Sequence, residues 1–342
     1  MKPLFLTCLY VFASLLVTAQ NEDSAFISKI SNEILLNSQA YNNLRVLTKT
    51  IGGRLAGSPQ MVKAEQWGLA ALKAAGSPDA YMQECMVPHW IRGGKDVAKA
   101  TYGSSSKTLD VVALGNSTGT MKPLKAPVLL IRNFEELERR KDEVKGKIVF
   151  YNYPFNATLV KTFQAYGDAG RYRREGPSRA AKYGALAVIV RSLTQSTDNN
   201  PHTGSTAYND SFQKIPAVAI GLHDADWLSK QTLEKNFAVT LHTHGRFLPD
   251  TIGHNVIGEI KGSALPAEFI TVGGHLDSWD NCEGAHDDGA GCVQTIEILR
   301  AFTAMGYKPR KTIRFVLFAN EENGLRGGNK YAEAAKEKGE RH

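Results

Sequence analysis

The segment Phe269–Ser278, with the sequence FITVGGHLDS, decides the fold because it joins a short apolar run to two glycines, a histidine and an aspartate. A short apolar run that ends in glycine is typical of a strand leading into a loop. The run Ile313–Phe318 ends in a similar way, at the polar segment Asn320–Gly324. Because both runs are almost continuously apolar, we expect strands buried on both faces, as in the parallel sheets of α/β proteins.

Segments with helical spacing flank these two strands. The apolar residues that share one helical face between them are Val293, Ile296, Leu299 and Phe302. Gly306 follows as a helix stop. Nearer the N-terminus, Asn21–Leu47 and Gln60–Ala75 have helical patterns, with a glycine-rich loop between them. We therefore predict an α/β fold in which a mixed, largely parallel sheet is sandwiched by helices.

A middle stretch, residues 122–245, alternates short apolar runs with polar helical segments. The runs are Pro127–Ile131, Lys147–Tyr151, Leu186–Val190, Pro216–Ile220 and Phe237–Leu241. Such alternation predicts a β/α module of its own, inserted into the chain. We therefore divide the sequence into a targeting segment (1–20), the inserted domain (122–245) and a main domain made of residues 21–121 and 246–342.

The charge and hydropathy patterns argue against two classes of protein. The chain of 342 residues carries 41 Lys and Arg against 34 Asp and Glu, a net charge of +7, and its basic residues are scattered rather than clustered. We therefore expect no binding of nucleic acid. After residue 20, no uninterrupted apolar run reaches the roughly 18 residues of a membrane span, so we expect no stable membrane insertion once that segment is removed.

The first residues indicate export. Lys2 and the apolar run Leu4–Val17, followed by small residues, are typical of a signal peptide that comprises residues 1–20. We therefore expect a secreted or periplasmic protein. The rest of the chain holds three cysteines, an odd number that does not suggest a disulfide framework, and Cys282 and Cys292 remain open as a pair or as buried thiols.

Residues that bind metal ions or move protons gather after residue 270. His275 follows the first strand, Asp287 precedes a helix, and Glu321-Glu322 follows the second strand. Ligands of open α/β sheets gather at the carboxyl ends of strands, and adjacent acidic side chains there are unfavourable unless a cation neutralises one of them. Asp277 can accept the second N–H of the imidazole, as partners of metal-bound histidines do. Together these residues predict a metal site.

These motifs resemble those of the M28 family of zinc metallopeptidases. Gly273–Asp280, Asp287-Asp288-Gly289 and Asn320–Gly324 are similar to that family's three motifs in order and spacing. Two further segments, Gly53–Ser58 and Pro88-His89-Trp90, resemble the carboxypeptidase Q branch of the family. The resemblance implies a zinc-exopeptidase fold in which the inserted module is a protease-associated domain.

The resemblance also implies a role for each of five residues. His275 would bind a first zinc ion, Asp287 would bridge two zinc ions, and Glu322 would bind the second. Glu321 would be the general base, Asp277 would orient His275, and the peptide bond after Asp287 would be cis. The implied function is that of an exported exopeptidase, which hydrolyses dipeptides or short peptides through a hydroxide shared by two zinc ions.

The ligand set that the family implies is incomplete in this sequence. One further carboxylate and one further histidine are expected downstream of Glu322, but the sequence ends at His342. The other histidines considered as ligands are His242, His244 and His286. The first two lie in the inserted module, and the third more often packs or lines a pocket. We therefore interpret the sequence as truncated at its C-terminus, and we expect residues 21–342 alone to be inactive and to bind zinc weakly.

Two alternatives to this function remain open. The chain could be a catalytically inactive binding or scaffold protein on the same fold, or it could be an aminopeptidase of the same family. The intact set of motif residues favours an enzyme that takes a short peptide as its partner, and a homodimer remains open. Arg171, Arg173 and Arg174 could clamp a substrate carboxylate, but we interpret them as a solvated basic helix face.

Overall fold

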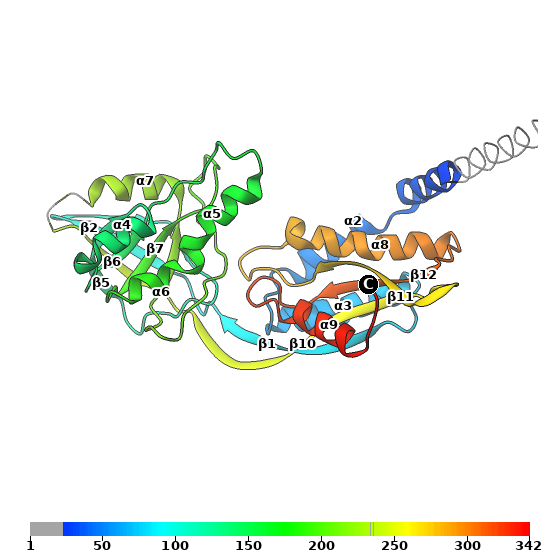
Figure 1. Ribbon diagram of the computed structural model, residues 1–342. Helices are drawn as coiled ribbons and strands as arrows, with labels where there is room; N and C mark the ends of the chain where they lie inside the picture. The colour runs from blue at the N-terminus through cyan, green and yellow to red at the C-terminus, as the bar shows by residue number, and fades with distance from the viewer. Residues whose placement is uncertain (1–22, 233, 235) are drawn as a thin grey trace, which may run out of the picture.

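A computed structural model describes residues 23–232, 234 and 236–342 of the chain. Its strands form a four-stranded sheet in the order β1-β10-β12-β11 and an eight-stranded sheet in the order β3-β2-β9-β5-β6-β7-β8-β4 (Figure 1). The strands are β1 (Tyr81–Ile91), β2 (Val97–Tyr102), β3 (Ser105–Leu109), β4 (Val111–Ala113), β5 (Leu124–Ile131), β6 (Ile148–Tyr151), β7 (Ala187–Arg191), β8 (Ala217–Ile220), β9 (Ala238–His242), β10 (Arg246–Ile260), β11 (Leu265–His275) and β12 (Lys311–Phe318). The helices and helical turns are α2 (Ala40–Arg45), η1 (Val46–Ile51), α3 (Pro59–Ala74), α4 (Phe134–Arg139), η2 (Lys141–Glu143), α5 (Thr162–Arg174), α6 (Gly176–Ala181), α7 (Leu222–Gln231), η3 (Ala285–Gly289), α8 (Ala290–Ala304) and α9 (Arg326–Glu337).

The four-stranded sheet is mixed, as predicted, but it is not largely parallel. Strands β11 and β12 are parallel, whereas β1 pairs antiparallel with β10 and β10 pairs antiparallel with β12. The prediction of a largely parallel sheet was wrong because it rested on the two strands that carry the motifs. Strands β1 and β10 instead form a long antiparallel ribbon, which runs from this sheet toward the eight-stranded one (Figure 1).

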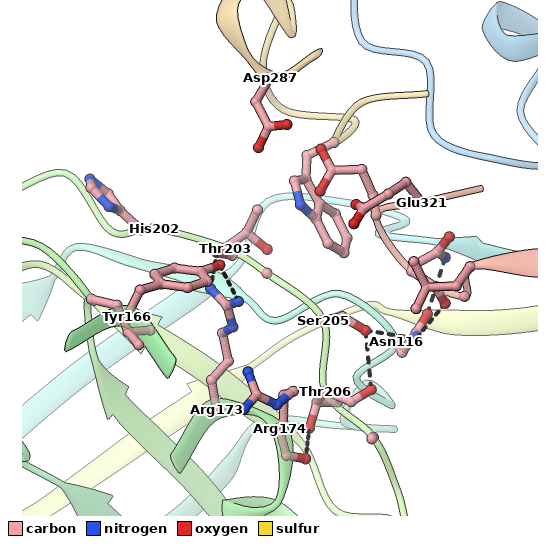
Figure 2. A pocket seen from close by; sticks show the side chains of 18 of the residues that line it. Asn116, Tyr166, Arg173, Arg174, His202, Thr203, Ser205, Thr206, Asp287 and Glu321 are labelled. Atoms are coloured by element: carbon pink, nitrogen blue, oxygen red, sulfur yellow. Dashed lines mark hydrogen bonds between the residues drawn. The ribbon is translucent and has the colours of Figure 1, made fainter. Parts of the chain in front are cut away.

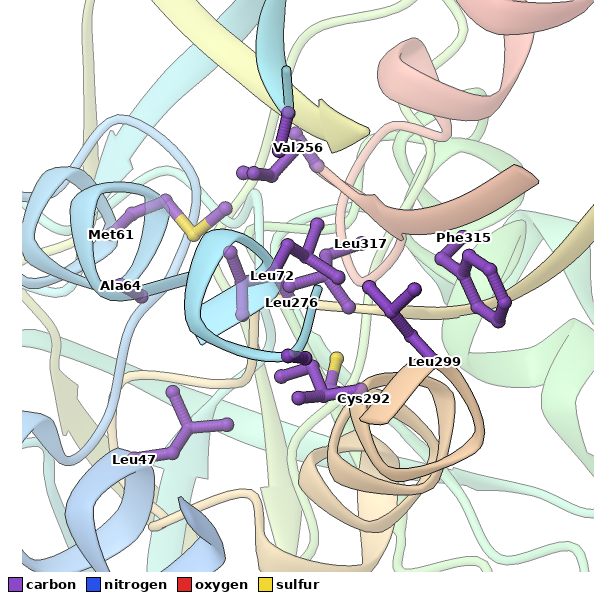
Figure 3. Packing of buried hydrophobic residues seen from close by; sticks show 14 of the residues in the cluster. Leu47, Met61, Ala64, Leu72, Val256, Leu276, Cys292, Leu299, Phe315 and Leu317 are labelled. Carbon is purple, nitrogen blue, oxygen red and sulfur yellow. The ribbon is translucent and has the colours of Figure 1, made fainter. Parts of the chain in front are cut away.

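Helices cover both faces of this sheet, as predicted. Alternate residues of the central strand β12 point to opposite faces. Phe315 and Leu317 enter the apolar core that α3 and α8 form on one face, where Met61 is also buried (Figure 3). On the other face Arg314 and Phe318 contact the ring of Tyr331 in α9.

Strand β11 differs from the prediction that both strands are buried on both faces. Strand β12 is buried over most of its length, but β11 lies at the edge of the sheet, where Ile270 is 48% exposed. The prediction for Phe269–Val272 was wrong because an apolar run does not reveal whether its strand is central or lies at an edge. Both strands still leave the sheet side by side.

The eight-stranded sheet contains all five strands predicted in the middle stretch, which are β5 to β9. Strands β5, β6, β7 and β8 are parallel, with helices in their connections, and the sheet has apolar cores of its own. Strands β2, β3 and β4 also belong to it, so the sheet begins earlier in the chain than residue 122. We call residues 97–242 the eight-stranded unit, and residues 40–91 with 246–342 the four-stranded unit.

The N-terminal part of the described chain is helical, with a break. Residues 23–37 form a helix and α2 follows after a break at Ser38-Gln39, where the sequence predicted one continuous helical segment. The predicted signal peptide, residues 1–20, lies outside the described residues. Among the residues described, no helix combines the length and the apolar character needed to cross a bilayer. Cys85, Cys282 and Cys292 are free thiols, so the alternative of a Cys282–Cys292 pair was wrong, and the alternative of buried thiols holds for Cys292 but not for Cys282, which is exposed.

Candidate active site

The two motif-bearing strands end side by side. In the parallel register of β11 and β12, His275 lies opposite Phe318, two residues before Asn320. The loops that follow both strands therefore start from the same edge of the sheet, where ligands of α/β proteins gather. The structure thus brings together the two segments that the sequence singled out.

His275 is held by one ring nitrogen and directed at a carboxylate by the other. Its Nδ1 lies 3.1 Å from the main-chain oxygen of Asp277, and its Nε2 lies 2.9 Å from Oδ1 of Asp287. Glu321 is more distant, with its Oε2 3.9 Å from the same Nε2. Burial lowers the pKa of His275, but the nearby carboxylate of Asp277 and the negative charges of Glu321 and Glu322 outweigh burial and raise this pKa to about 10.

Asp277 organises the site differently from the prediction. Its fully buried carboxylate accepts hydrogen bonds from the main-chain N–H groups of Glu321 and Glu322, at 2.9 and 3.1 Å. The carboxylate oxygen nearest to Nδ1 of His275 is 3.6 Å away, beyond a normal hydrogen bond, and the main-chain oxygen of Asp277 is the closer partner. The carboxylate therefore ties the two motif loops together.

Asp288 is a residue whose contribution the sequence analysis missed. Its carboxylate accepts hydrogen bonds from the main-chain N–H of His275 and from that of Gly291 in the first turn of α8. A Cβ atom at Gly274 or Gly291 would lie 2.5 or 2.3 Å from this carboxylate, so only glycine fits at both positions. These two glycines were the available signal. The expected cis peptide bond between Asp287 and Asp288 is present.

Negative charge is concentrated at the ends of the two strands. The pKa of Glu322 is raised to about 8, first by burial and then by the negative charges of Asp277 and Asp287. Burial also raises the pKa of Glu321, in part against the attraction of His275. A cation at this position would offset the cost of burying these charged carboxylates and would reduce the repulsion between them.

The donor set fits zinc by its chemistry. Imidazole and carboxylate groups are typical zinc ligands, and an imidazole Nε2 that faces a carboxylate requires a proton or a metal ion between them. His275 and Asp287 are already adjacent, and Glu322 lines the same cavity. Within the described part of the chain, no three such side chains are arranged to hold one ion together. His242 and His244 neighbour one another, with ring centroids 4.4 Å apart, at the end of the eight-stranded unit.

A cavity of about 1240 Å³ lies between the two units and includes this site. Figure 2 shows Asp287 and Glu321 on one side of it, and Tyr166 and Arg173 of α5 on the other. The sequence analysis considered the arginines of α5 as a carboxylate clamp but set that hypothesis aside, because nothing in the pattern indicated that α5 would face the motif loops.

Arg173 does not belong to a solvated helix face, and that interpretation was wrong for this residue. The side chain is buried, and its Nη2 and Nη1 donate hydrogen bonds to the Tyr166 hydroxyl at 2.6 Å and to the Thr203 main-chain oxygen at 3.2 Å. Its buried Nε has no hydrogen-bond partner, and the partners of the other two nitrogens are uncharged. Arg174 is exposed, and Arg171 pairs with Asp168.

Three contacts join the units beside the cavity. Arg92, in the segment between the two units, forms a two-pronged ion pair with Asp280 at 2.9 and 2.7 Å and donates to the main-chain oxygen of Ala113 at 2.5 Å. Asn116 Nδ2 donates a hydrogen bond to the main-chain oxygen of Asn323 at 3.2 Å, and Asn323 Nδ2 donates one to Asn116 Oδ1 at 3.1 Å. A Cβ atom at Gly115 would lie 1.9 Å from the ring of Trp279, so glycine is required there. Both motif loops therefore touch the eight-stranded unit.

The chain is similar in sequence and fold to known peptidases. Residues 255–341 match the model of peptidase family M28. The crystal structure of a peptidase M28 precursor from Shewanella amazonensis has a TM-score of 0.88 and 31% identity, and the match covers 94% of this chain and 73% of that one. The chain belongs to peptidase family M28. The fold of this M28 chain is also similar to that of BSAP, a zinc aminopeptidase from Bacillus subtilis, with a TM-score of 0.60, 22% identity and coverage of 86% and 64%.

Curated relatives of this M28 chain include mouse carboxypeptidase Q. The two are 35% identical over 301 residues, which are 87% of this chain and 62% of the relative. The chain thus spans somewhat less than two thirds of the length of that relative.

Proposed function

We propose that this M28 protein is an exported zinc exopeptidase that hydrolyses dipeptides or short peptides. The observation that carries the proposal is the pair formed by His275 Nε2 and Asp287 Oδ1, which lie 2.9 Å apart at the edge of a large cavity. His275 and Asp287 would hold one zinc ion, and Asp287 with Glu322 a second. When bound, zinc polarises the scissile carbonyl and lowers the pKa of water.

Glu321 is the proposed general base. Its carboxylate lines the cavity and lies close to His275, and burial raises its pKa. A carboxylate with a raised pKa is suited to take a proton from the attacking water and to give it to the leaving amine. Asp277 would fix the position of Glu321 through the hydrogen bond to its main-chain N–H.

Arg173 supports the carboxypeptidase direction over the aminopeptidase alternative. Arg173 is largely buried, lines the cavity on the wall opposite Asp287 and Glu321, and donates only to uncharged groups. A buried cation with uncharged neighbours favours an anionic ligand, and guanidinium groups bind carboxylates well. The C-terminal carboxylate of a short peptide would supply that charge while the scissile bond lies near His275.

The remaining parts of the proposal concern the organisation of the protein. The eight-stranded unit would be a protease-associated domain that closes the cavity. It consists of the module predicted over residues 122–245 together with β2 to β4. Residues 1–20 would direct export to the periplasm or the exterior. No nucleic acid takes part, and a homodimer remains an assembly to be tested.

The function is tested in the full-length protein, the parent in every comparison below, by separating metal binding from catalysis. His275→Ala should lose zinc, measured by elemental analysis, because it removes a ligand. Glu321→Gln should keep zinc but lower kcat for dipeptides by roughly 10²–10⁴-fold, because it removes only the proton transfer. Glu283→Gln, an exposed residue that pairs with Lys49, serves as the matched control and should change neither quantity.

Three results would contradict parts of the proposal. Zinc retained in His275→Ala would refute the metal site, and near-parent turnover in Glu321→Gln would refute the general base. Peptide binding without hydrolysis by the parent protein would favour the alternative of a non-catalytic binding protein.

A further inference from the structure

Arg54 is a fully buried cation whose guanidinium is bound by main-chain oxygens. Its Nε donates to the oxygen of Leu276 at 2.5 Å, and its Nη2 donates to that of Gly284 at 3.0 Å. Its Nη1 donates to the oxygens of Glu283 at 2.7 Å and Gly52 at 3.3 Å. Burying a guanidinium among neutral acceptors is costly unless its N–H groups find partners, and here each of the three nitrogens donates at least one hydrogen bond.

The carbonyls that Arg54 binds lie at the two ends of one loop. Residues 276–284 contain no strand or helix. Leu276 directly follows His275, and Gly284 precedes Asp287 by three residues. The loop therefore starts at one member of the His275–Asp287 pair and ends beside the other, and a single guanidinium binds both ends.

The main chain around Arg54 reinforces this contact. Ser278 N–H donates to the main-chain oxygen of Arg54 at 3.3 Å, and Arg54 N–H donates to Ser278 Oγ at 3.2 Å. A Cβ atom at Gly53 would lie 2.6 Å from the main-chain oxygen of Asp280, so the loop packs directly against backbone.

We propose that Arg54 is a positioning residue, which sets the separation of His275 and Asp287 by binding both ends of loop 276–284. The inference rests on the proposed function in one respect, that this pair binds metal. A planar guanidinium directs several N–H groups in fixed directions, whereas an ammonium group is a single point donor on a flexible stem. Lysine at this position would keep the charge but could not reach both ends of the loop.

The experiment compares the parent protein with Arg54→Lys. Zinc affinity is measured by calorimetric titration, and opening of the loop by hydrogen exchange of residues 276–284. We expect zinc to bind about 10–100-fold more weakly, as on loss of a group that orients a ligand, and exchange in the loop to accelerate. Arg54→Ala should lose more affinity, and added methylguanidinium should restore part of it together with the protection of the loop.

Arg314→Lys is the matched control. Arg314 is also buried in the four-stranded unit, but it binds the side chains of Glu259 and Glu340, away from the loop. This variant should lower the thermal stability and leave zinc affinity and loop exchange unchanged. An equal loss of affinity in Arg314→Lys would overturn the inference, because the effect would then follow general stability.

The inference and the proposed function fail in different ways. A parent protein that binds no zinc refutes the proposed function, and the loop exchange of Arg54→Lys and Arg54→Ala still tests the positioning role. A parent that binds zinc, with unchanged affinity and unchanged loop exchange in Arg54→Lys, refutes the positioning role alone.

Discussion

Asp277 illustrates how one buried carboxylate can organise a site without being one of the proposed metal ligands. Both of its oxygens accept main-chain N–H groups, those of Glu321 and Glu322, while its own carbonyl holds the His275 ring. The three contacts link the proposed ligands His275 and Glu322 and the proposed base Glu321 to a single residue. A change at Asp277 should therefore affect both motif loops.

The prediction at this position concerns Asp277→Asn. An asparagine amide can accept only one of the two N–H groups, because its NH2 group would face the other donor. We expect zinc affinity to fall about 10–100-fold and the free energy of unfolding to fall by about 1–3 kcal/mol, the cost of an unsatisfied buried polar group. Calorimetric titration and urea unfolding measure the two effects. Asp280→Asn, in the same loop but paired with Arg92, is the control and should leave zinc affinity unchanged.

Sequence reasoning found the residues that stand in motifs and missed those that act through burial. His275 and the glutamate pair follow strands and Asp287 precedes a helix, in a recognisable order, so their meeting near one sheet edge could be predicted. Arg54 and Arg173 could not be assigned from sequence, because an arginine bound by uncharged groups has the same local pattern as one in solvent. If Asp277→Asn binds zinc as tightly as the parent, the role proposed for Asp277 in organising the site is wrong.

At the scale of elements, the sequence predicted the strands better than their positions in the sheet. The runs that became β11 and β12 are similarly apolar, yet one is an edge strand and the other is central. The difference arises from β10, which pairs with β12 and comes from a segment whose burial pattern is mostly exposed in its first half. Pairing between distant segments is not encoded in any one of them.

A matched pair of isoleucines tests this difference. Ile270 and Ile313 are register partners on β11 and β12, but Ile270 is 48% exposed and Ile313 is 7% exposed. Ile313→Ala should lower the free energy of unfolding by about 2–5 kcal/mol, because it leaves a cavity in the core. Ile270→Ala should cost about 1 kcal/mol or less, because little apolar surface is uncovered. Equal losses in urea unfolding would indicate that β11 is covered in the folded protein.

At the scale of the whole molecule, the cavity requires both units. The ribbon of β1 and β10 connects them. Asn116 and Asn323 join the eight-stranded unit to one motif loop, and Arg92, just before that unit, bridges Asp280 of the other loop and the main-chain oxygen of Ala113. Asp287 and the proposed base Glu321 then lie on one wall of the cavity, and Arg173, the proposed carboxylate-binding residue, lies on the opposite wall (Figure 2). Sequence analysis predicted an inserted module but not this arrangement, because the contacts between the units are single residues without a pattern.

The last prediction tests whether the eight-stranded unit selects the substrate. If Arg173 binds the C-terminal carboxylate, the parent should prefer a free peptide over the same peptide with an amidated C-terminus. Arg173→Gln removes the charge, and KM for the free peptide should rise by about 10–100-fold, the equivalent of about 1.5–3 kcal/mol for a hydrogen bond to a charged group. The kcat should change little, because Arg173 lies on the wall opposite the proposed base Glu321.

The amidated peptide is the internal control, and its KM should be the same for parent and variant. Arg179→Gln, which removes a surface arginine paired with Glu175 in the same unit, should leave both substrates unaffected. An unchanged preference for the free carboxylate in Arg173→Gln would refute the assignment. If acetylation of the peptide N-terminus, rather than amidation of the C-terminus, abolishes turnover by the parent, the protein is an aminopeptidase. The cation on the eight-stranded unit then stabilises the cavity wall and does not select the substrate.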